Sequence, residues 1–166
     1  MTLAGISAPA PLLPTHDLEP FDYGDTSLTE WLTTRALKSQ TNDSARTYVV
    51  CIGNTVVGYY CLATGAIARE HAPKPMGRNM PDPIPVIVLG RFAVDLAYQS
   101  KGIGSGLPKD AILRSLQVSE IVGVKAILVH ALSEEAKRYY LARSFLVSPI
   151  HPMTLCLPIG TARQAL

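Results

Sequence analysis

Gln99-Ser100-Lys101-Gly102-Ile103-Gly104-Ser105-Gly106 joins an apolar run, predicted to be a strand, to a segment predicted to be a helix. Glycines allow turns with positive φ and let backbone N–H groups approach a ligand, and the first turn of a helix adds partial positive charge. We therefore expect an anion to bind here. The spacing matches neither the Gly-Lys-Ser/Thr phosphate loop nor G-x-G-x-x-G, which disfavours nucleotide hydrolysis and dinucleotide binding. A glycine-rich turn without a ligand is the alternative that this motif leaves open.

The composition is that of a globular chain of one domain. Its 166 residues are 48% hydrophobic and 17% charged, which is apolar enough to suggest a surface buried in an oligomer or against a partner. Fifteen Lys and Arg against thirteen Asp and Glu leave a net charge of +2, so nucleic-acid binding would need a local basic patch. No boundary or repeat is evident, and a single domain over residues 1–166 is predicted.

The cysteines, the N-terminus and the histidines favour a cytoplasmic protein without a metal site. The first residues lack a basic stretch, and no apolar run reaches the roughly 18 residues of a membrane span. The four histidines are scattered without the spacing of metal ligands. In apolar surroundings and without C-x-x-C spacing, buried free thiols are expected at Cys51, Cys61 and Cys156.

Strand and helix signals alternate along the first third of the chain. An edge strand is predicted around residues 12–18. A helix follows to about Gln40, and the capping box Ser27-x-x-Glu30 marks its start. A β-hairpin with its turn at Gly53-Asn54 is predicted from the Val-, Tyr- and Thr-rich runs at residues 46–52 and 55–67.

The remainder of the chain predicts an ordered loop and then alternating strands and helices. Five prolines between residues 69 and 85 argue against regular structure, so we expect a surface loop that is either functional or a simple connection. A strand follows, then a helix that buries Ala111, Ile112, Leu116 and Ile121. The further predictions are a strand at 124–132, a helix from the cap Ser133 to about Ser144, and closing strands within 146–157. The order β-α-β-β-β-α-β-α-β indicates an α+β domain on a twisted mixed sheet.

Two separated motifs resemble the GNAT superfamily of N-acetyltransferases. Gln99-x-x-Gly102-x-Gly104, directly after the strand at 86–94, is similar to the acetyl-CoA signature Q/R-x-x-G-x-G/A. Residues 136–145 are similar to the segment A-x-x-F-Y-x-x-x-G-F that follows the fifth strand of that superfamily. The resemblance implies a GNAT-like fold, in which the central strand pair splays apart and binds acetyl-CoA as co-substrate.

Within the superfamily, further segments resemble the toxins of type II toxin–antitoxin modules. The similarity lies in residues 16–32, 46–50, 58–60 and 89–91. Those toxins acetylate the amino group of aminoacyl-tRNA and stop translation. The resemblance therefore implies an aminoacyl-tRNA substrate, a ribbon-helix-helix antitoxin as partner, and the homodimer that is common in this family.

The resemblance also assigns the residues that would bind the co-substrate. The backbone of Phe92, Ala93 and Val94 would hydrogen-bond the pantetheine arm like an added strand. Independently of the resemblance, the Ser133 hydroxyl could orient a water or the thiol, unless it is only a helix cap. Main-chain N–H groups would surround the diphosphate from Gln99, Lys101, Gly102, Gly104 and Ser105.

Tyr140 matches the tyrosine that the superfamily places near the thioester sulfur, which implies that its phenol protonates the departing thiolate. A phenol has a pKa of about 10 and a thiol a pKa of about 8.5, so a modest shift of either pKa makes proton transfer from the phenol to the thiolate nearly balanced. Packing on the core is the alternative role for Tyr140. No general base is evident, and an α-amine near 8 costs about 3 kcal/mol less to deprotonate than a lysine amine near 10.4. An aminoacyl group, a protein N-terminus and a small amine all remain possible acceptors.

A tRNA substrate would need cations beside the acceptor cleft, although any one of them can equally be a solvated surface charge. Two departures from the superfamily pattern keep a weakened CoA-binding or antitoxin-binding module open as an alternative. Pro108 falls in the helix after the glycine-rich turn, and Ser144 replaces the usual glycine before Phe145. The candidate cations for tRNA are Arg46, Arg69, Lys74, Arg78 and Arg91.

Overall fold

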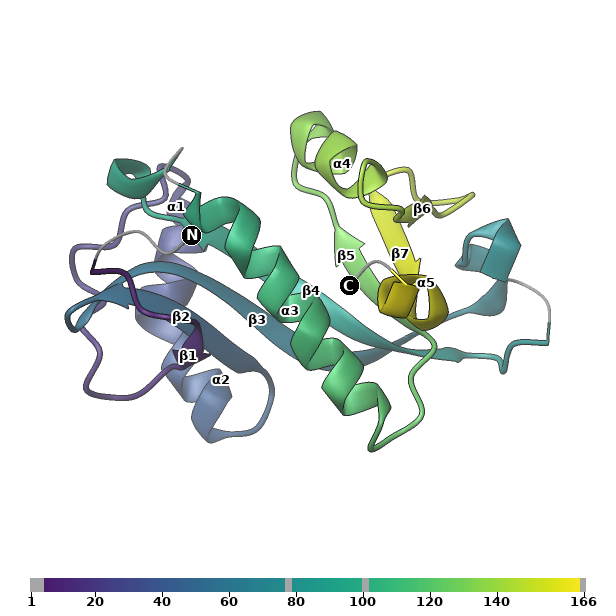
Figure 1. Cartoon of the computed structure of the whole chain (residues 1–166), viewed down its shortest axis with the longest axis horizontal. Coiled ribbons are helices and arrows are strands. Elements are labelled where there is room, and N and C mark those ends of the chain that lie inside the picture. Colours follow the sequence, from purple (N-terminus) through teal and green to yellow (C-terminus); the bar gives the residue numbers. More distant parts are fainter. Residues whose placement is uncertain (1–4, 77–78, 100–101, 165–166) are drawn as a thin grey trace. The chain divides into compact units, whose positions relative to one another are not determined.

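The computed structural model describes residues 5–76, 79–99 and 102–164, and within these it leaves out the side chain of Ser105 (Figure 1). The chain divides into two compact units, which are considered separately. The first consists of Met1–Ala63 and Gly90–Ala111, and the second of Thr64–Leu89 and Ile112–Leu166. The single domain over residues 1–166 stays a prediction.

Seven strands form one mixed sheet, in which each described pairing lies within one of the two units. β4 and β5 pair in parallel, whereas β1–β2, β2–β3, β5–β7 and β6–β7 are antiparallel. The predicted α+β class is therefore confirmed. In sheet order the strands are β1 (Ala10–Pro11), β2 (Arg46–Ile52), β3 (Thr55–Ile67), β4 (Ile84–Val94), β5 (Ala126–His130), β7 (Thr154–Pro158) and β6 (Leu146–Val147).

The β2–β3 hairpin of the first unit has the predicted boundaries, with its turn at Gly53 in the left-handed region (φ 58°). The edge strand predicted at residues 12–18 is wrong, because β1 pairs with β2 only at Ala10 and Pro11. The Leu12 N–H still donates to the Thr47 carbonyl at 2.9 Å. Pro14 has no N–H to continue such a ladder, which accounts for the early end of this strand.

A helical segment follows the N-terminal strand and ends one residue beyond the prediction. It comprises α1 (Thr26–Trp31), the π-helical turn η1 (Leu32–Ala36) and α2 (Leu37–Thr41). Its cap is Asp25 rather than the predicted Ser27, because the Asp25 carboxylate accepts the Ser27 N–H at 2.8 Å. The carboxylate satisfies an N–H group that the first helical turn leaves unpaired.

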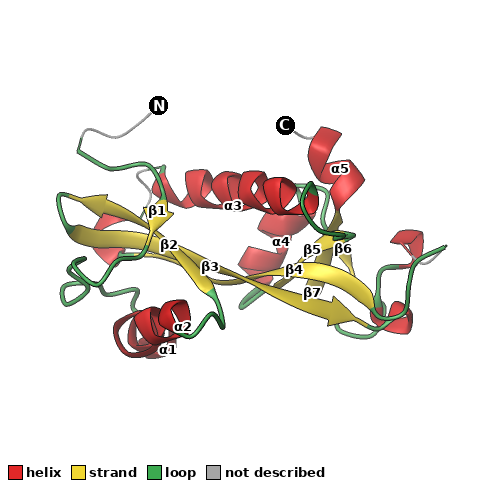
Figure 2. Cartoon of the chain, turned by 90° about the horizontal axis from the view of Figure 1, so that it is seen from below, coloured by secondary structure: helices red, strands yellow, loops and turns green. Residues whose placement is uncertain are grey.

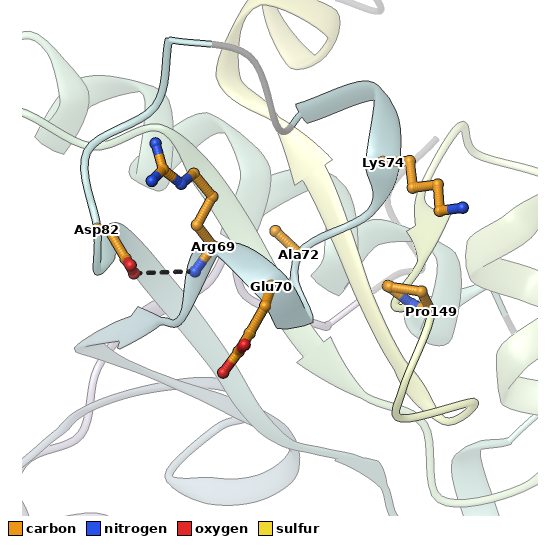
Figure 3. Close-up of a pocket in the computed structure, with 6 residues that line it drawn as sticks. All are labelled: Arg69, Glu70, Ala72, Lys74, Asp82 and Pro149. Carbon is orange, nitrogen blue, oxygen red and sulfur yellow. Dashed lines mark hydrogen bonds between the residues drawn. The ribbon is translucent and has the colours of Figure 1, made fainter.

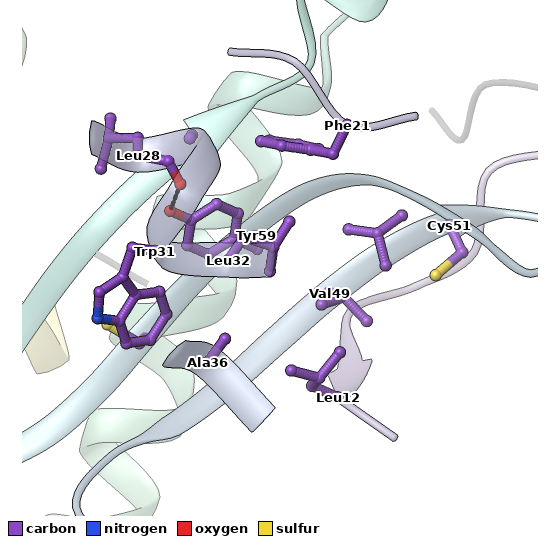
Figure 4. Packing of buried hydrophobic residues seen from close by; sticks show 12 residues of the cluster. Leu12, Phe21, Leu28, Trp31, Leu32, Ala36, Val49, Cys51 and Tyr59 are labelled. Carbon is purple, nitrogen blue, oxygen red and sulfur yellow. Dashed lines mark hydrogen bonds between the residues drawn. The ribbon is translucent and has the colours of Figure 1, made fainter. Parts of the chain in front are cut away.

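Tyr59 of β3 is the centre of the first unit's core (Figure 4). Its fully buried ring stacks on Trp31 with a centroid separation of 6.0 Å and meets Phe21 edge-on at 5.5 Å. Its hydroxyl donates to the Leu28 carbonyl at 2.7 Å. The helical segment from α1 to α2 therefore packs against the face of the sheet to which Tyr59 points.

The neighbours of Tyr59 point to the opposite face, where α3 (Ile103–Ser119) begins. The Tyr60 hydroxyl donates to the Asp110 carboxylate, and Ile103 and Leu107 pack over Gly58. A Cβ on Gly58 would lie 2.9 Å from Val50 Cγ2 and 3.2 Å from Leu107 Cδ1, so the close approach requires a glycine. Figure 2 shows α1 and α2 on one side of these strands and α3 on the other.

Two residues bear on the helix predicted after the glycine-rich turn, and one of them corrects the prediction. Because it begins at Ile103, Pro108 lies beyond the first turn and cannot donate an N–H to the Gly104 carbonyl, yet the helix continues to Ser119. The burial predicted for Ile121 is wrong, because this residue follows the helix and its side chain is 83% exposed. Among the described helices, none has the length and apolar character needed to cross a membrane.

The second unit uses the proline-rich loop as part of its core. The absence of regular structure predicted there is wrong, because two short 3₁₀ turns form, η2 (Arg69–His71) and η3 (Lys74–Met76). A 3₁₀ turn needs few backbone hydrogen bonds, so prolines interrupt it less than a long helix. Ala72 and Met76 are buried with Ile84 of β4 and Leu128 of β5.

The predicted strand and helix that follow are also present in the second unit. β5 is shorter than predicted, and α4 (Glu134–Leu141) begins after Ser133, whose hydroxyl accepts the Ala136 N–H at 3.0 Å. A further short helix, α5 (Ile159–Gln164), was not predicted.

Ser144 has the backbone conformation of the glycine that it replaces. Its φ is 72°, and the N–H groups of Arg143 and Phe145 both donate to the Tyr140 carbonyl, at 3.0 and 3.2 Å. These bonds end α4 in the way that a left-handed residue allows. A side chain at this φ is strained, so the chain keeps the turn at a conformational cost.

We expect Ser144→Gly to raise the free energy of unfolding by about 0.5–1 kcal/mol, because glycine adopts a positive φ without strain and this gain exceeds its greater freedom in the unfolded chain. Urea unfolding followed by circular dichroism measures the change. Ala142→Gly is the matched control, since Ala142 has a right-handed φ of −64° and should lose stability. A loss of stability in Ser144→Gly would contradict the strain at this turn.

Candidate functional site

The path from β4 to the glycine-rich turn is fixed by Asp95, a residue that the sequence analysis missed. Asp95 is 8% exposed and caps η4 (Leu96–Tyr98), where its Oδ1 accepts the Ala97 N–H at 2.9 Å. Its Oδ2 accepts the Asp22 N–H at 2.8 Å. The signal in the sequence is the aspartate itself, because an aspartate carboxylate often accepts the backbone N–H two residues later and forms an Asx turn.

The described residues of the glycine-rich turn are compatible with the predicted anion site. The Gln99 amide donates to the Val94 carbonyl at 3.0 Å and so ties the turn to the end of β4. Gly102 has a φ of 84°, and a Cβ there would meet no atom within 4 Å, so conformation rather than space requires the glycine. The first N–H groups of α3 have no partner within the helix and can donate hydrogen bonds to an anion. Lys101 and the side chain of Ser105 lie outside the described residues.

The strand predicted to bind the pantetheine arm continues beyond its parallel partner. Pairing of β4 with β5 covers Val86 to Leu89 opposite Ala126 to Val129, and β4 runs on to Val94. Phe92 is half-buried, and the other two predicted residues, Ala93 and Val94, are buried. The end of β4 therefore has backbone groups that β5 does not pair, as binding of an added strand requires.

A kink precedes this end of β4. Arg91 has a φ of 47°, which is rare for a residue with a side chain, and the Cys61 thiol donates to the Gly90 carbonyl at 3.1 Å. The Arg91 guanidinium lies 4.7 Å from the centroid of the Trp31 ring. Left-handed residues inside strands bend them, and such strain is concentrated at functional positions.

In the second unit, Tyr140 lies near the end of α4 and is 8% exposed. Its ring packs against Phe145 at 5.1 Å and meets Tyr139 edge-on at 5.4 Å. The packing role and the proton-donor role are therefore compatible, because an aromatic ring can pack while its hydroxyl serves another group. Ser133 has the cap role that the sequence left open, and its contact with the co-substrate stays a prediction.

Tyr139 differs from its neighbour because its buried hydroxyl has no hydrogen-bond partner among the described residues. Burial raises the pKa of this phenol, although the nearby Arg143 lowers it. The Arg143 guanidinium lies over the ring at 3.5 Å. At this position the superfamily segment has a phenylalanine. The Tyr139 hydroxyl is therefore an additional polar group, and the described residues around it give it no hydrogen-bond partner.

The structure separates the five candidate cations into different settings. Arg46 is paired with Asp43 at 2.7 Å. Arg78 lies outside the described residues, and Arg91 stacks on Trp31. Only two of the described candidates come together: the pocket in Figure 3 is lined by Arg69, Glu70, Ala72, Lys74, Asp82 and Pro149.

Carboxylates offset the charge of that pocket. The Arg69 N–H donates to the Asp82 carboxylate at 3.0 Å, and its guanidinium donates to the Met80 carbonyl at 3.3 Å. Glu70 contributes a second carboxylate to the lining. The pocket is therefore of mixed charge, and its role in binding tRNA stays a prediction.

The cysteines are buried and free, as predicted. Burial raises the pKa of Cys61 and of Cys156 to about 11 each, and it also raises that of Cys51. These thiols are therefore protonated at neutral pH and poor nucleophiles, which argues against an acetylated cysteine as an intermediate. In the described part of the chain, no three His, Cys, Asp or Glu side chains are grouped to hold a metal.

Comparison with known proteins identifies the family. No protein-family model matches the chain. A tRNA-acetylating toxin from Mycobacterium tuberculosis (strain ATCC 25618 / H37Rv) is 43% identical over 161 residues, which covers 97% of each protein. The chain belongs to the family of tRNA-acetylating toxins. Its membership of the GNAT superfamily, predicted from the two motifs, is thereby confirmed.

Solved structures of toxins from this superfamily have the same fold. AtaT complexed with acetyl-methionyl-tRNAfMet is 28% identical, with a TM-score of 0.88 over 96% of this chain and 98% of that one. A tyrosine-to-phenylalanine variant of AtaT, bound to acetyl-CoA and to the C-terminus of the antitoxin AtaR, is 26% identical with a TM-score of 0.81. That match covers 96% of both chains. The GNAT-like fold is therefore confirmed.

We expect Tyr139→Phe to raise the free energy of unfolding by up to about 1 kcal/mol, because it removes a buried hydroxyl without a partner. Tyr59→Phe is the matched control, because the Tyr59 hydroxyl donates to Leu28 and its loss should cost about 1 kcal/mol. Chemical unfolding of both variants measures the two changes. Equal losses in the two variants would show that the Tyr139 hydroxyl has a partner.

Proposed function

We propose that this chain transfers an acetyl group from acetyl-CoA to the α-amine of aminoacyl-tRNA and thereby blocks translation as the toxin of a toxin–antitoxin module. The observation that carries the proposal is the 43% identity with a tRNA-acetylating toxin over 97% of the chain. The described geometry supports it through the start of α3, whose first N–H groups can bind an anion, and through the end of β4 that β5 does not pair.

The co-substrate is held by backbone groups. N–H groups at Gln99, Gly102 and Gly104, with those of Lys101 and Ser105, bind the diphosphate. The end of β4 from Phe92 to Val94 hydrogen-bonds the pantetheine arm. Both contacts depend on main-chain geometry, so they place the thioester with little freedom and supply the orientation that acyl transfer needs.

The reaction then needs a neutral amine and a proton for the departing thiolate. The amine nitrogen bonds to the acetyl carbon, the carbon–sulfur bond breaks, and the nitrogen loses one proton to solvent. The Tyr140 phenol gives its proton to the thiolate and regains one from solvent, so that one proton moves in net from nitrogen to sulfur. An α-amine suits this chemistry without a dedicated base, because a fraction of it is neutral at physiological pH.

The same activity determines the partners and the place of action. The resemblance predicts a ribbon-helix-helix antitoxin, and the toxin AtaT is known in complex with the C-terminus of the antitoxin AtaR. A homodimer stays a prediction. We place the chain in the cytoplasm, where aminoacyl-tRNA is the substrate of translation.

Two features that left a weakened, non-catalytic module open are accommodated by the fold. α3 continues through Pro108 to Ser119, and Ser144 adopts the positive φ that the usual glycine would have. Neither departure breaks the element that contains it. The acetylation of protein N-termini or small amines is the other alternative, because these acceptors also present an amine of low basicity.

We expect Tyr140→Phe to lower kcat for aminoacyl-tRNA by about 10²–10⁴-fold, because the thiolate loses its proton donor. The affinity for acetyl-CoA should change little, since the diphosphate contacts are unaffected. Release of free thiol measures kcat, and calorimetric titration measures binding. In cells the substitution should abolish toxicity.

Tyr139→Phe is the control for this experiment, because it removes a hydroxyl from the adjacent residue and should retain wild-type turnover. Wild-type kcat in Tyr140→Phe would exclude the phenol as the acid. If the wild-type chain acetylates peptide N-termini but no aminoacyl-tRNA, the function is that of a protein N-acetyltransferase. If acetyl-CoA produces no heat with folded protein, the enzyme proposal fails.

A further inference from the structure

Arg91 occupies a strand position that the backbone makes unfavourable for it. Its φ of 47° suits glycine or asparagine, and it follows Gly90 directly in β4. The local conformation therefore does not explain an arginine. A long charged side chain at a strained position is better explained by what its guanidinium does.

The guanidinium is supported from one side by a row of aromatic rings. It lies 4.7 Å from the centroid of the Trp31 ring, and that ring stacks at 12° on Tyr59. Stacking uses the flat face of a guanidinium and leaves the N–H donors in its plane. The Arg91 side chain hydrogen-bonds the Cys61 thiol, and the remaining donors of the fork can bind another group. Among the described residues, no carboxylate pairs with Arg91.

Among the described residues, each of the other candidate cations is either paired with a carboxylate or lies beside one. The Arg46 guanidinium is bonded to Asp43 and to the Gln40 carbonyl. Arg69 and Lys74 share their pocket with Glu70 and Asp82. Arg91 therefore differs from them, because it combines an exposed guanidinium with a rigid support.

The faces of the first unit indicate which substrate this guanidinium serves. Trp31 belongs to α1, which packs on the Tyr59 face, whereas the anion site at the start of α3 lies on the face of Gly58 and Tyr60. The diphosphate of acetyl-CoA and the Arg91 guanidinium are therefore on opposite faces of these strands. A phosphate bound by Arg91 belongs to the acceptor.

We propose that Arg91 binds a backbone phosphate near the 3′ end of aminoacyl-tRNA and thereby positions the aminoacyl ester. The proposal rests on the proposed function and narrows its predicted cations to one. Arg91 precedes Phe92, where the strand proposed to bind the pantetheine arm begins, so an acceptor held there is adjacent to the acetyl group. A guanidinium fork fits a phosphate with two parallel N–H bonds, which fixes orientation as well as affinity.

The test is a set of three variants with two acceptors. Arg91→Asn removes the cation but keeps a residue that tolerates positive φ, so the kink is retained. Arg91→Lys keeps the charge without the planar fork. Arg35→Gln removes an exposed cation from the same helical segment and is the matched control. The acceptors are the aminoacyl-tRNA that wild type acetylates best and an aminoacyl-adenosine with the same amino acid but no phosphate.

For Arg91→Asn we expect the KM for aminoacyl-tRNA to rise about tenfold to a hundredfold, the range for loss of a charged hydrogen bond. The ratio of kcat/KM for aminoacyl-tRNA to that for aminoacyl-adenosine should fall by the same factor. The slope of log affinity against log salt should decrease by about 0.7, the value for one contact with a single strand. Arg91→Lys should recover part of the affinity, and Arg35→Gln should change KM less than about threefold, the usual effect of one distant surface charge.

Three outcomes would overturn the proposal. A KM for aminoacyl-tRNA within twofold of wild type in Arg91→Asn would exclude the contact. An effect on the KM for acetyl-CoA instead would assign the guanidinium to the co-substrate. An equal effect of Arg35→Gln would indicate a diffuse positive surface. Failure of the wild-type chain to acetylate any aminoacyl-tRNA would instead refute the proposed function, and thermal melting of each variant separates all of these from misfolding.

Discussion

The close approach of α3 to the sheet at Gly58 is the constraint on which the first unit depends. Ile103 and Leu107 occupy the space that a side chain at Gly58 would need. Both are buried, and each such side chain contributes about 1.5–3 kcal/mol when removed from water. Because Ile103 is also the first residue of α3, the contact that stabilises the helix fixes the position of its unpaired N–H groups.

A single strand distributes the two substrates of the proposed reaction. In β3, alternate residues point to opposite faces, so Gly58 and Tyr60 contact α3 while Tyr59 contacts α1. The start of α3, where the anion site is predicted, therefore lies on one face and the Arg91–Trp31 stack on the other. A thioester and an amine that approach from opposite faces can meet at β4 without competing for the same surface.

The sequence predicted those elements whose signals are local. The hairpin has its predicted boundaries because Gly53-Asn54 supplies the turn and β-branched residues supply the strands. α4 begins directly after its predicted cap Ser133, because this cap is recognised from neighbouring residues. The anion site indicated by the motif at Gln99 and the roles of its residues stay predictions.

The features that the sequence did not reveal depend on distant partners. The cap at Asp25 competes with an equally good pattern at Ser27, and the choice follows from how the chain enters the helix. The buried Asp95 is explained by the Asp22 N–H, which is far away in the sequence. The exposed Ile121 follows the end of α3, and a periodic apolar pattern does not show where a helix ends.

The two strained residues of the described chain that matter for the site differ in what maintains them. Ser144 takes a glycine conformation that ends α4, and hydrogen bonds to the Tyr140 carbonyl fix this turn. At Arg91 the Cys61 thiol fixes the preceding Gly90 carbonyl, and Trp31 supports the side chain. A serine in place of glycine has only a stability cost, whereas an arginine there presents a charge. The strain at Arg91 therefore accompanies the proposed phosphate contact, whereas the strain at Ser144 accompanies the turn that ends α4 beside Tyr140.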